Sequence, residues 1–298
     1  MRGQLEIHTI ASLLADAKAR GIGESDAFWL LSALLGKSRS ELLLDRQQSV
    51  HIRFAKKYRA WTRARAGGKP MQYIAGFADF FGREFHVDSG VLIPRPETES
   101  LVELALAEGD RLEKVLGRKL RVADIGTGSG AIAITLKLER PQWEIFASDV
   151  SGAALTVARA NARKLSAKVI FRKGDLFAAW GMGTRAPRFD LVVANLPYVW
   201  RGKEKVERQV AAYEPALALF PRRNSLSRMR NAGAHLAERM LLDCLENPRG
   251  IRAIVLELSA TVAYDLERRF VKDPRIASLA RISDLAGRRR FLKLLLEA

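Results

Sequence analysis

The feature that most constrains the fold is a repeated alternation of short apolar segments with helix-patterned segments in the second half of the chain. The segments RVADIG, EIFASD, KVIFRKGD, FDLVVANLPY and IRAIVLEL have the composition of strands, and amphipathic stretches such as AIAITLKLE and AALTVARANA follow the first two. Strands that are separated by helices pair as parallel neighbours covered by helices on both faces. The sequence therefore predicts an α/β fold with a doubly wound parallel sheet.

Two other patterns precede this region. In residues 7–66, apolar side chains such as Ile10, Leu13 and Leu14 recur at helical spacing, which predicts a small helical bundle. Residues 73–94 are rich in aromatic residues, β-branched residues and glycine, a composition typical of a β-hairpin. We expect a helical domain at residues 1–72, a β-hairpin connector at 73–96 and a Rossmann-like domain at 97–298.

Composition narrows the class of protein. The chain of 298 residues has 50 Lys and Arg against 33 Asp and Glu, a net charge of +17 that favours an acidic partner such as a ribonucleoprotein. No apolar run reaches the roughly 20 residues of a membrane span, and the N-terminal stretch carries Glu6 and Asp16 where an export signal would be apolar. The single cysteine, Cys244, and four scattered histidines offer neither a disulfide nor a metal site. We expect a cytoplasmic protein without a metal and without a membrane contact.

A glycine-dense turn follows the first strand of the sheet region. Gly126, Gly128 and Gly130 lie between a predicted strand and a predicted helix, where glycine lets the backbone approach a ligand and the helix N-terminus presents free N–H groups. The G-x-G-x-G spacing differs from the dinucleotide fingerprint, and no lysine follows as in a P-loop. An NTPase is therefore disfavoured.

Three aspartates end successive predicted strands beside this turn. Asp149 lies about 20 residues after the glycines, where a carboxylate can accept hydrogen bonds from both ribose hydroxyls of an adenosine cofactor. Asp175 ends the next strand and is placed to accept from the adenine amino group, while Asp124 ends the first. The alternative is that each aspartate only caps the helix that follows it. The set favours S-adenosylmethionine as the cofactor.

The segment Asn195-Leu196-Pro197-Tyr198 follows a buried strand, at the sheet edge where α/β folds bind ligands. The Asn195 side-chain oxygen and the Leu196 carbonyl can each accept one N–H of a planar amide or exocyclic amine, and Tyr198 can pack over its face. Methyl transfer to a nitrogen held in this way depends on positioning more than on acid–base catalysis. Asn195, Pro197 and Tyr198 are thus the candidate catalytic residues, and the alternative is a turn that merely ends the strand.

At this point the chain resembles the release factor glutamine methyltransferase family over nearly its whole length. The matching segments are residues 69–76 (KPMQYIAG), 80–82, 91–99 (VLIPRPETE), 124–133, 149, 174–175, 195–198, 214–219 (EPALAL), 256–257 and 284–288. The resemblance implies methylation of the side-chain amide nitrogen of the glutamine in the Gly-Gly-Gln motif of peptide chain release factors, the proteins of translation termination. It also implies that the N-terminal domain holds the release factor while the Rossmann-like domain carries out the chemistry.

The resemblance implies site residues as well. S-adenosylmethionine is expected to contact Gly126, Thr127, Gly128, Ser129, Gly130, Asp149, Leu176 and Asn195. The substrate glutamine is expected to contact Asn195, Leu196, Pro197 and Tyr198. The residue-based alternative for 94–97 is a rigid hinge whose acidic residues, Glu97 and Glu99, open the next helix.

The chain departs from the family pattern at two places, which keeps alternative functions open. Leu196 replaces the first proline of the usual Asn-Pro-Pro-Tyr, which makes the motif similar to that of ribosomal RNA adenine dimethylases, and residues 220–226 replace a glycine-rich turn. Residues 201–230 contain eight basic and three acidic residues, typical of either an RNA contact or a solvated surface. The alternatives are glutamine methylation of a ribosomal protein, N6-adenine methylation of ribosomal RNA, and a non-catalytic ribonucleoprotein-binding protein.

Overall fold

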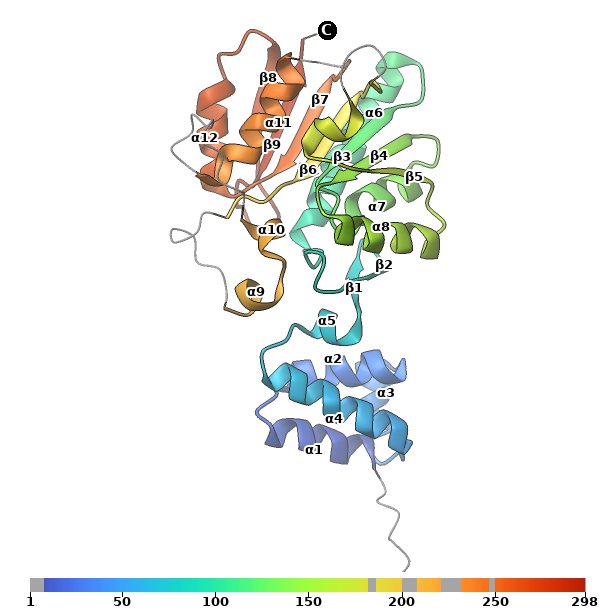
Figure 1. Cartoon of the computed structure of the whole chain (residues 1–298). Coiled ribbons are helices and arrows are strands. Elements are labelled where there is room, and N and C mark those ends of the chain that lie inside the picture. The colour runs from blue at the N-terminus through green and yellow to red at the C-terminus, as the bar shows by residue number, and fades with distance from the viewer. Residues whose placement is uncertain (1–7, 182–185, 200–207, 221–231, 247–249, 298) are drawn as a thin grey trace, which may run out of the picture. The chain divides into compact units, whose positions relative to one another are not determined.

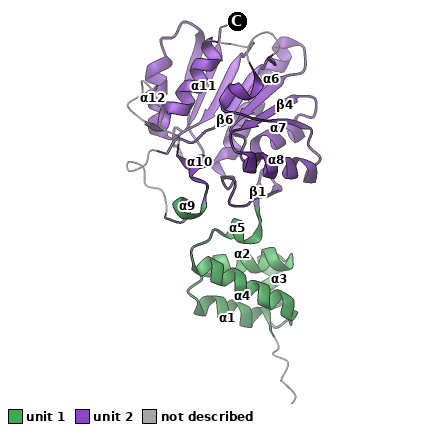
Figure 2. Ribbon diagram, in the orientation of Figure 1, with its two compact units in different colours: residues 1–77, 208–213 green, residues 78–207, 214–298 purple. Residues whose placement is uncertain are grey.

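The computed structural model describes residues 8–181, 186–199, 208–220, 232–246 and 250–297. The chain divides into two compact units, one formed by residues 1–77 and 208–213 and the other by 78–207 and 214–298 (Figure 2). The first unit is helical, and the second contains a β-hairpin and a seven-stranded sheet with helices on both faces. The predicted fold class is confirmed.

The helical unit is a small bundle with its own core. Its helices are α1 (Ile10–Ala19), α2 (Glu24–Leu35), α3 (Arg39–Leu44), α4 (Ile52–Ala66), α5 (Met71–Ala75) and α9 (Arg208–Tyr213). Helix α2 ends at Gly36, whose φ of 67° is in the left-handed region. Helix α3 begins after Ser38, which forms a capping box with Glu41. The buried Tyr58 of α4 donates a hydrogen bond of 3.0 Å to the carbonyl of Ala27, which ties α4 to α2.

The second unit begins with the hairpin of β1 (Phe77–Phe80) and β2 (Arg83–His86). Its large sheet has the strand order β5-β4-β3-β6-β7-β9-β8 (Figure 1). The five strands from β5 to β7 pair in parallel, whereas β9 is antiparallel to both β7 and β8. The strands are β3 (Arg121–Ile125), β4 (Glu144–Asp149), β5 (Val169–Lys173), β6 (Leu191–Asn195), β7 (Ala253–Glu257), β8 (Ile276–Ile282) and β9 (Phe291–Leu296).

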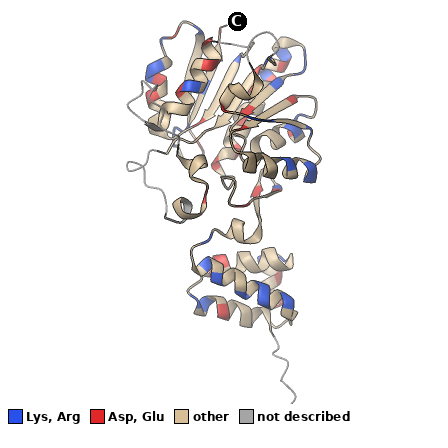
Figure 3. Cartoon of the chain, in the orientation of Figure 1, with Lys and Arg blue, Asp and Glu red and all other residues tan. Residues whose placement is uncertain are grey.

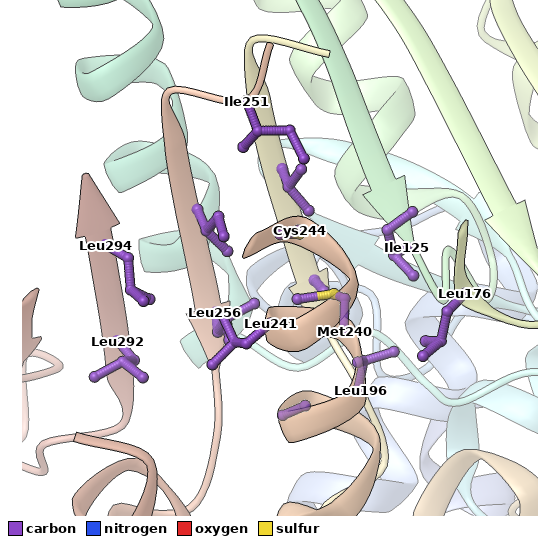
Figure 4. Close-up of a cluster of buried hydrophobic side chains, with 14 of the residues drawn as sticks. Ile125, Leu176, Leu196, Met240, Leu241, Cys244, Ile251, Leu256, Leu292 and Leu294 are labelled. Atoms are coloured by element: carbon purple, nitrogen blue, oxygen red, sulfur yellow. The ribbon is translucent and has the colours of Figure 1, made fainter. Parts of the chain in front are cut away.

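Alternate residues of the central strands face two separate hydrophobic clusters. Val193 packs in one cluster with α6 (Glu97–Leu116) and α7 (Ala131–Glu139). Its neighbour Val192 packs in the other with α11 (His235–Glu246) and α12 (Ala260–Phe270), part of which Figure 4 shows. The remaining helices of the unit are α8 (Gly152–Lys164), α10 (Ala216–Leu219) and the short 3₁₀ helices η1 (Leu176–Trp180) and η2 (Ala232–Ala234). Because both faces of the central strands are covered, β6 is apolar and buried from Leu191 to Ala194 and does not alternate with polar residues.

Parallel pairing brings the carboxyl ends of β3, β4, β5 and β6 to one edge of the sheet. Each predicted site segment follows one of these ends. None of the described helices combines the length and the apolar character that crossing a bilayer requires.

Candidate active site

A cavity of about 380 Å³ opens at this edge of the sheet, a size typical of small-molecule sites. Five segments that are distant in sequence line it: residues 90–98, 125–132, 148–154, 174–176 and 195–197. The wall also includes Phe80 of β1, residues of the 215–218 segment, and two side chains of α11, Leu236 and Arg239. The structure therefore brings the glycine turn and the Asn195 segment to the same cavity.

The glycine turn joins β3 to α7 and needs glycine for two reasons. Gly126 and Gly130 have φ values of 79° and 84°, in the region that side chains disfavour. A Cβ on Gly126 would also lie 2.9 Å from the Leu196 side chain, and one on Gly130 would lie 2.8 Å from Ile134. The turn is held to β4 by the backbone N–H groups of residues 126 and 127, which donate to the Ser148 carbonyl at 2.8 and 3.0 Å. Thr127 and Ser129 line the cavity with Gly126 and Gly128, whereas Gly130, also predicted to contact the cofactor, is not among its lining residues.

Asp124 hydrogen-bonds residues of the glycine turn and of α7, and it does not line the cavity. It is fully buried, and its Oδ2 accepts hydrogen bonds from the Thr127 hydroxyl at 2.6 Å and the Ala133 N–H at 3.2 Å. Burial raises the pKa of Asp124 to about 7, although these two donors oppose the shift. Asp124 is thus a brace for the turn, unlike the other two strand-end aspartates.

Asp149 lines the cavity at the end of β4. Its Oδ2 accepts from the Gly128 N–H at 2.9 Å and its Oδ1 from the Ser151 N–H at 2.8 Å. Burial raises its pKa above the ordinary value, against the effect of these N–H donors. The N-cap of α8 is Ser151, so capping that helix is not the function of Asp149. A carboxylate has about four acceptor positions, so both oxygens retain capacity for a ligand.

Asp175 and Leu176 lie after β5 on the same wall. Asp175 Oδ2 accepts from Arg239 of α11 at 2.7 Å, a cavity-lining pair that the sequence patterns did not indicate because the partners are 64 residues apart. Leu176 is buried in the cluster of Figure 4 and has a φ of 48°, rare for a leucine. Such strain of about 1–3 kcal/mol is commonly found at ligand sites.

The acceptor segment begins at the last residue of β6. Asn195, Leu196 and Pro197 line the cavity, whereas Tyr198 packs against the hydrophobic cluster that contains Leu196. Leu196 is buried, and Figure 4 shows its side chain between those of Leu176 and Met240. The residue that departs from the family pattern is therefore held in place by packing.

Thr98 and Glu257 contact the acceptor segment and were not among the predicted site residues. The Asn195 Nδ2 donates to the Thr98 Oγ1 at 3.2 Å, and the Thr98 hydroxyl also hydrogen-bonds the Glu257 carboxyl. Glu257 ends β7 and pairs in register with Asn195. Burial raises the pKa of Glu257 to about 7, with Thr98 opposing the shift. A carboxylate at the end of an apolar strand, the signal that identified Asp149, would have found Glu257.

The segment at 91–99 lines the cavity in addition to starting α6. Arg95 lies on the wall and forms an ion pair of 2.6 Å with Glu214, whose side chain is almost fully buried. Burial raises the pKa of Glu214 despite this partner. Glu97 and Glu99 lie in the first turn of α6, as the hinge interpretation expected. The segment therefore both lines the cavity and supplies the acidic residues of the first turn of α6, and its role as a hinge stays a prediction.

The basic stretch at 201–230 falls mostly outside the described residues, as does the altered loop beyond Phe220. Elsewhere, the exposed side of α4 carries Arg53, Lys56, Lys57 and Arg63, and none of these four forms an ion pair with a described residue (Figure 3). In contrast, Asp16 and Asp26 neutralise Arg59 and Arg65 of the same helix. We call the four side chains the α4 basic face.

Comparison with known families identifies two domains. A family model described as the Methyltransferase small domain matches residues 110–213, and one described as the PrmC N-terminal domain matches residues 7–76. A crystal structure of the N-terminal domain of human METTL16 is similar with a TM-score of 0.53 at 15% identity, covering 99% of this chain and 96% of that one. At that identity, the likeness shows the fold alone.

Several relatives carry the name release factor glutamine methyltransferase. The protein of Streptococcus pneumoniae is 45% identical over 163 residues, so that the chain spans about half the length of this relative, 54% of each being covered. The protein of Bacteroides thetaiotaomicron is 37% identical over 75% of both chains. That of Bordetella pertussis is 36% identical over 78% of this chain and 82% of its own. Because the last two relatives are matched over three quarters or more of their length, the chain belongs to the release factor glutamine methyltransferase family.

Proposed function

We propose that this protein transfers a methyl group from S-adenosylmethionine to the side-chain amide nitrogen of the glutamine in the Gly-Gly-Gln motif of peptide chain release factors. One observation carries the proposal: the glycine turn with Asp149 and the acceptor residues 195–197 line a single cavity. S-adenosylmethionine held by the glycine turn and Asp149, and a glutamine amide held by residues 195–197, would meet within this one cavity. The names of the relatives point to the same reaction.

The cavity residues fit S-adenosylmethionine. Asp149 has acceptor capacity for the two ribose hydroxyls beyond its bonds to the N–H groups of Gly128 and Ser151. Asp175, whose Oδ2 accepts from Arg239, still has acceptor positions for the adenine amino group, and Leu176 offers the ring an apolar surface. When bound, this cofactor supplies a methyl group already activated on a sulfonium, which leaves as a neutral sulfide.

The chain's contribution to transfer is to hold the acceptor nitrogen. The Asn195 Oδ1 and the Leu196 carbonyl each accept one N–H of the glutamine amide, so that the nitrogen faces the methyl group. A bond forms between this nitrogen and the methyl carbon as the bond from that carbon to sulfur breaks, and one amide proton leaves to water. Pro197 restricts the backbone of Leu196 to extended conformations, and Tyr198 anchors the segment to the hydrophobic cluster.

Leu196 is compatible with this role. A proline would fix its φ through a ring, whereas here the buried side chain fixes the residue by packing against the glycine turn. The carbonyl of residue 196 is the group that accepts the N–H, and every residue type provides it.

The helical domain, residues 1–72, is the part that we assign to gripping the release factor. The α4 basic face adds a second contact, to the ribosome or its RNA, because four exposed cations without acidic partners among the described residues favour phosphate groups. Release factors act on ribosomes, so we place the reaction in the cytoplasm.

The test is transfer of a labelled methyl group to purified release factor, to ribosomal proteins and to ribosomal RNA in parallel, followed by peptide mass mapping. Label on the glutamine of Gly-Gly-Gln is expected. Asn195→Ala should abolish transfer and leave the affinity for S-adenosylmethionine within about threefold, since the acceptor nitrogen is no longer held whereas the glycine turn and Asp149 still bind the cofactor. Label on RNA would instead favour the adenine methyltransferase, and cofactor binding without any transfer would favour a binding protein.

A further inference from the structure

The orientation of the Asn195 amide decides what the acceptor site can bind. An amide presents an oxygen that accepts hydrogen bonds on one side and an NH₂ that donates them on the other. If the oxygen faces the cavity, a substrate amide can donate to it. If the NH₂ faces the cavity, two donors oppose each other and the substrate nitrogen is not held. Which orientation is present depends on the partners behind Asn195.

Thr98 and Glu257 are those partners. The Thr98 Oγ1 lies 3.2 Å from the Asn195 Nδ2, and the same hydroxyl is hydrogen-bonded to the Glu257 carboxyl. Both side chains are buried, with 5% and 1% of their surface exposed. Water is therefore not a ready substitute for either contact.

Counting protons shows how this arrangement selects one orientation. A hydroxyl has one proton to donate. When Glu257 is ionised it can only accept, so the Thr98 proton points to Glu257 and the Thr98 oxygen must accept from Asn195. The donor side of the amide is then fixed toward Thr98, and its oxygen is left for the cavity that Asn195 lines.

We propose that Thr98 and Glu257 are positioning residues, which together hold the Asn195 side-chain oxygen toward the acceptor nitrogen. The inference rests on the proposed methyl transfer and adds to it two residues that need not touch the methyl group. It also makes transfer depend on the ionisation of Glu257. A protonated Glu257 can donate to Thr98, whose own proton then points to Asn195 and favours the reversed amide.

The charged groups around Glu257 influence the pH at which its carboxyl ionises. Arg290 and Arg95 favour the carboxylate, Glu97 opposes it, and Arg290 is itself paired with Asp284 at 2.7 Å. The Oε2 of Glu257 has no hydrogen-bond partner among the described residues. Burial and this missing partner outweigh the two arginines, consistent with a pKa of about 7. Transfer should therefore fall as the pH decreases through 7.

The experiment compares Thr98→Val, Thr98→Ser and Glu257→Gln with the wild type in labelled methyl transfer to release factor. Thr98→Val keeps the shape and removes the hydroxyl, and kcat should fall about tenfold or more, the factor that corresponds to one hydrogen bond. Thr98→Ser restores the hydroxyl and should restore kcat. Glu257→Gln cannot ionise and, like the protonated acid, can donate to Thr98, so its kcat should be low at every pH and its pH dependence should be lost.

Thr135→Val is the matched control, because Thr135 is buried in α7, its hydroxyl has no hydrogen-bond partner within the described part of the chain, and it does not line the cavity. It should leave kcat and the pH profile unchanged. Thr98→Val should keep the affinity for S-adenosylmethionine, whereas the midpoint of thermal unfolding should fall because buried partners of the hydroxyl lose their contact. A Thr98→Val protein with wild-type kcat and pH profile would overturn the positioning role while leaving the proposed function intact. Absence of transfer by the wild type itself would overturn both.

Discussion

Replacing Asp149 by alanine should weaken cofactor binding far more than it weakens the fold. If the two ribose hydroxyls donate to this carboxylate, the variant loses two charge-assisted hydrogen bonds of about 1.5–3 kcal/mol each. The lower figure for the pair corresponds to an increase of about 100-fold in the Kd for S-adenosylmethionine. In the unliganded protein, the N–H groups of Gly128 and Ser151 lose their acceptor. They lie at an open cavity where water can replace it, so we expect a loss of only about 1–2 kcal/mol in the free energy of unfolding.

The assay is calorimetric titration of the cofactor combined with urea unfolding of the free protein. Adenosine alone should lose affinity in the same way, because the contact is to its ribose. Asp149→Asn retains one acceptor oxygen and should lie between the wild type and the alanine variant. Asp124→Asn is the matched control, since Asp124 lies one residue before the end of the neighbouring strand β3 but does not line the cavity. Unchanged affinity of Asp149→Ala, with the stability loss alone, would refute the assignment and leave Asp149 as a structural brace.

Three further predictions concern stability and partner binding. Folding raises the pKa of Asp124 from 3.8 to about 7, so the stability it contributes is full below pH 3.8 and is lost as the pH rises through 7. Asp124→Asn should thus gain about 2–3 kcal/mol in unfolding free energy relative to wild type between about pH 5 and pH 8, and a pH-independent difference in urea unfolding would contradict this. Gly109→Ala should destabilise by about 2 kcal/mol despite better helix propensity, because its Cβ would lie 2.2 Å from the buried Trp143 ring; in thermal unfolding, Gly152→Ala, whose Cβ meets nothing closer than 3.7 Å, should show no such loss. Lys56→Glu with Lys57→Glu should weaken binding to ribosomal RNA fragments and reduce the salt slope by about 2, whereas Lys18→Glu with Arg20→Glu, at the C-terminal end of α1, tests whether any exposed charge pair has the same effect.

Much of the site could be predicted because it is local. The glycine turn needs residues that tolerate positive φ, and three glycines in five positions between a strand and a helix are visible in any sequence. Asn195 follows directly on a buried strand, and the parallel topology places the ends of such strands at one edge. The strand and helix periods that lead to this topology are also local.

What the sequence by itself determined is therefore the fold class, the edge of the sheet at which ligands bind, and the segments that reach it. The tertiary structure decided which groups face the cavity and which support it. Asp124 and Asp149 both follow apolar residues near the end of a strand. The side chain of Asp124 accepts a hydrogen bond from Thr127 of the glycine turn, whereas Asp149 lines the cavity. Likewise Thr98, Asn195 and Glu257 are far apart in the chain and meet only because β6 pairs with β7 and α6 begins beside them. The physical reason is that backbone preferences act between near neighbours, whereas hydrogen-bond partners and burial are set by how distant segments pack.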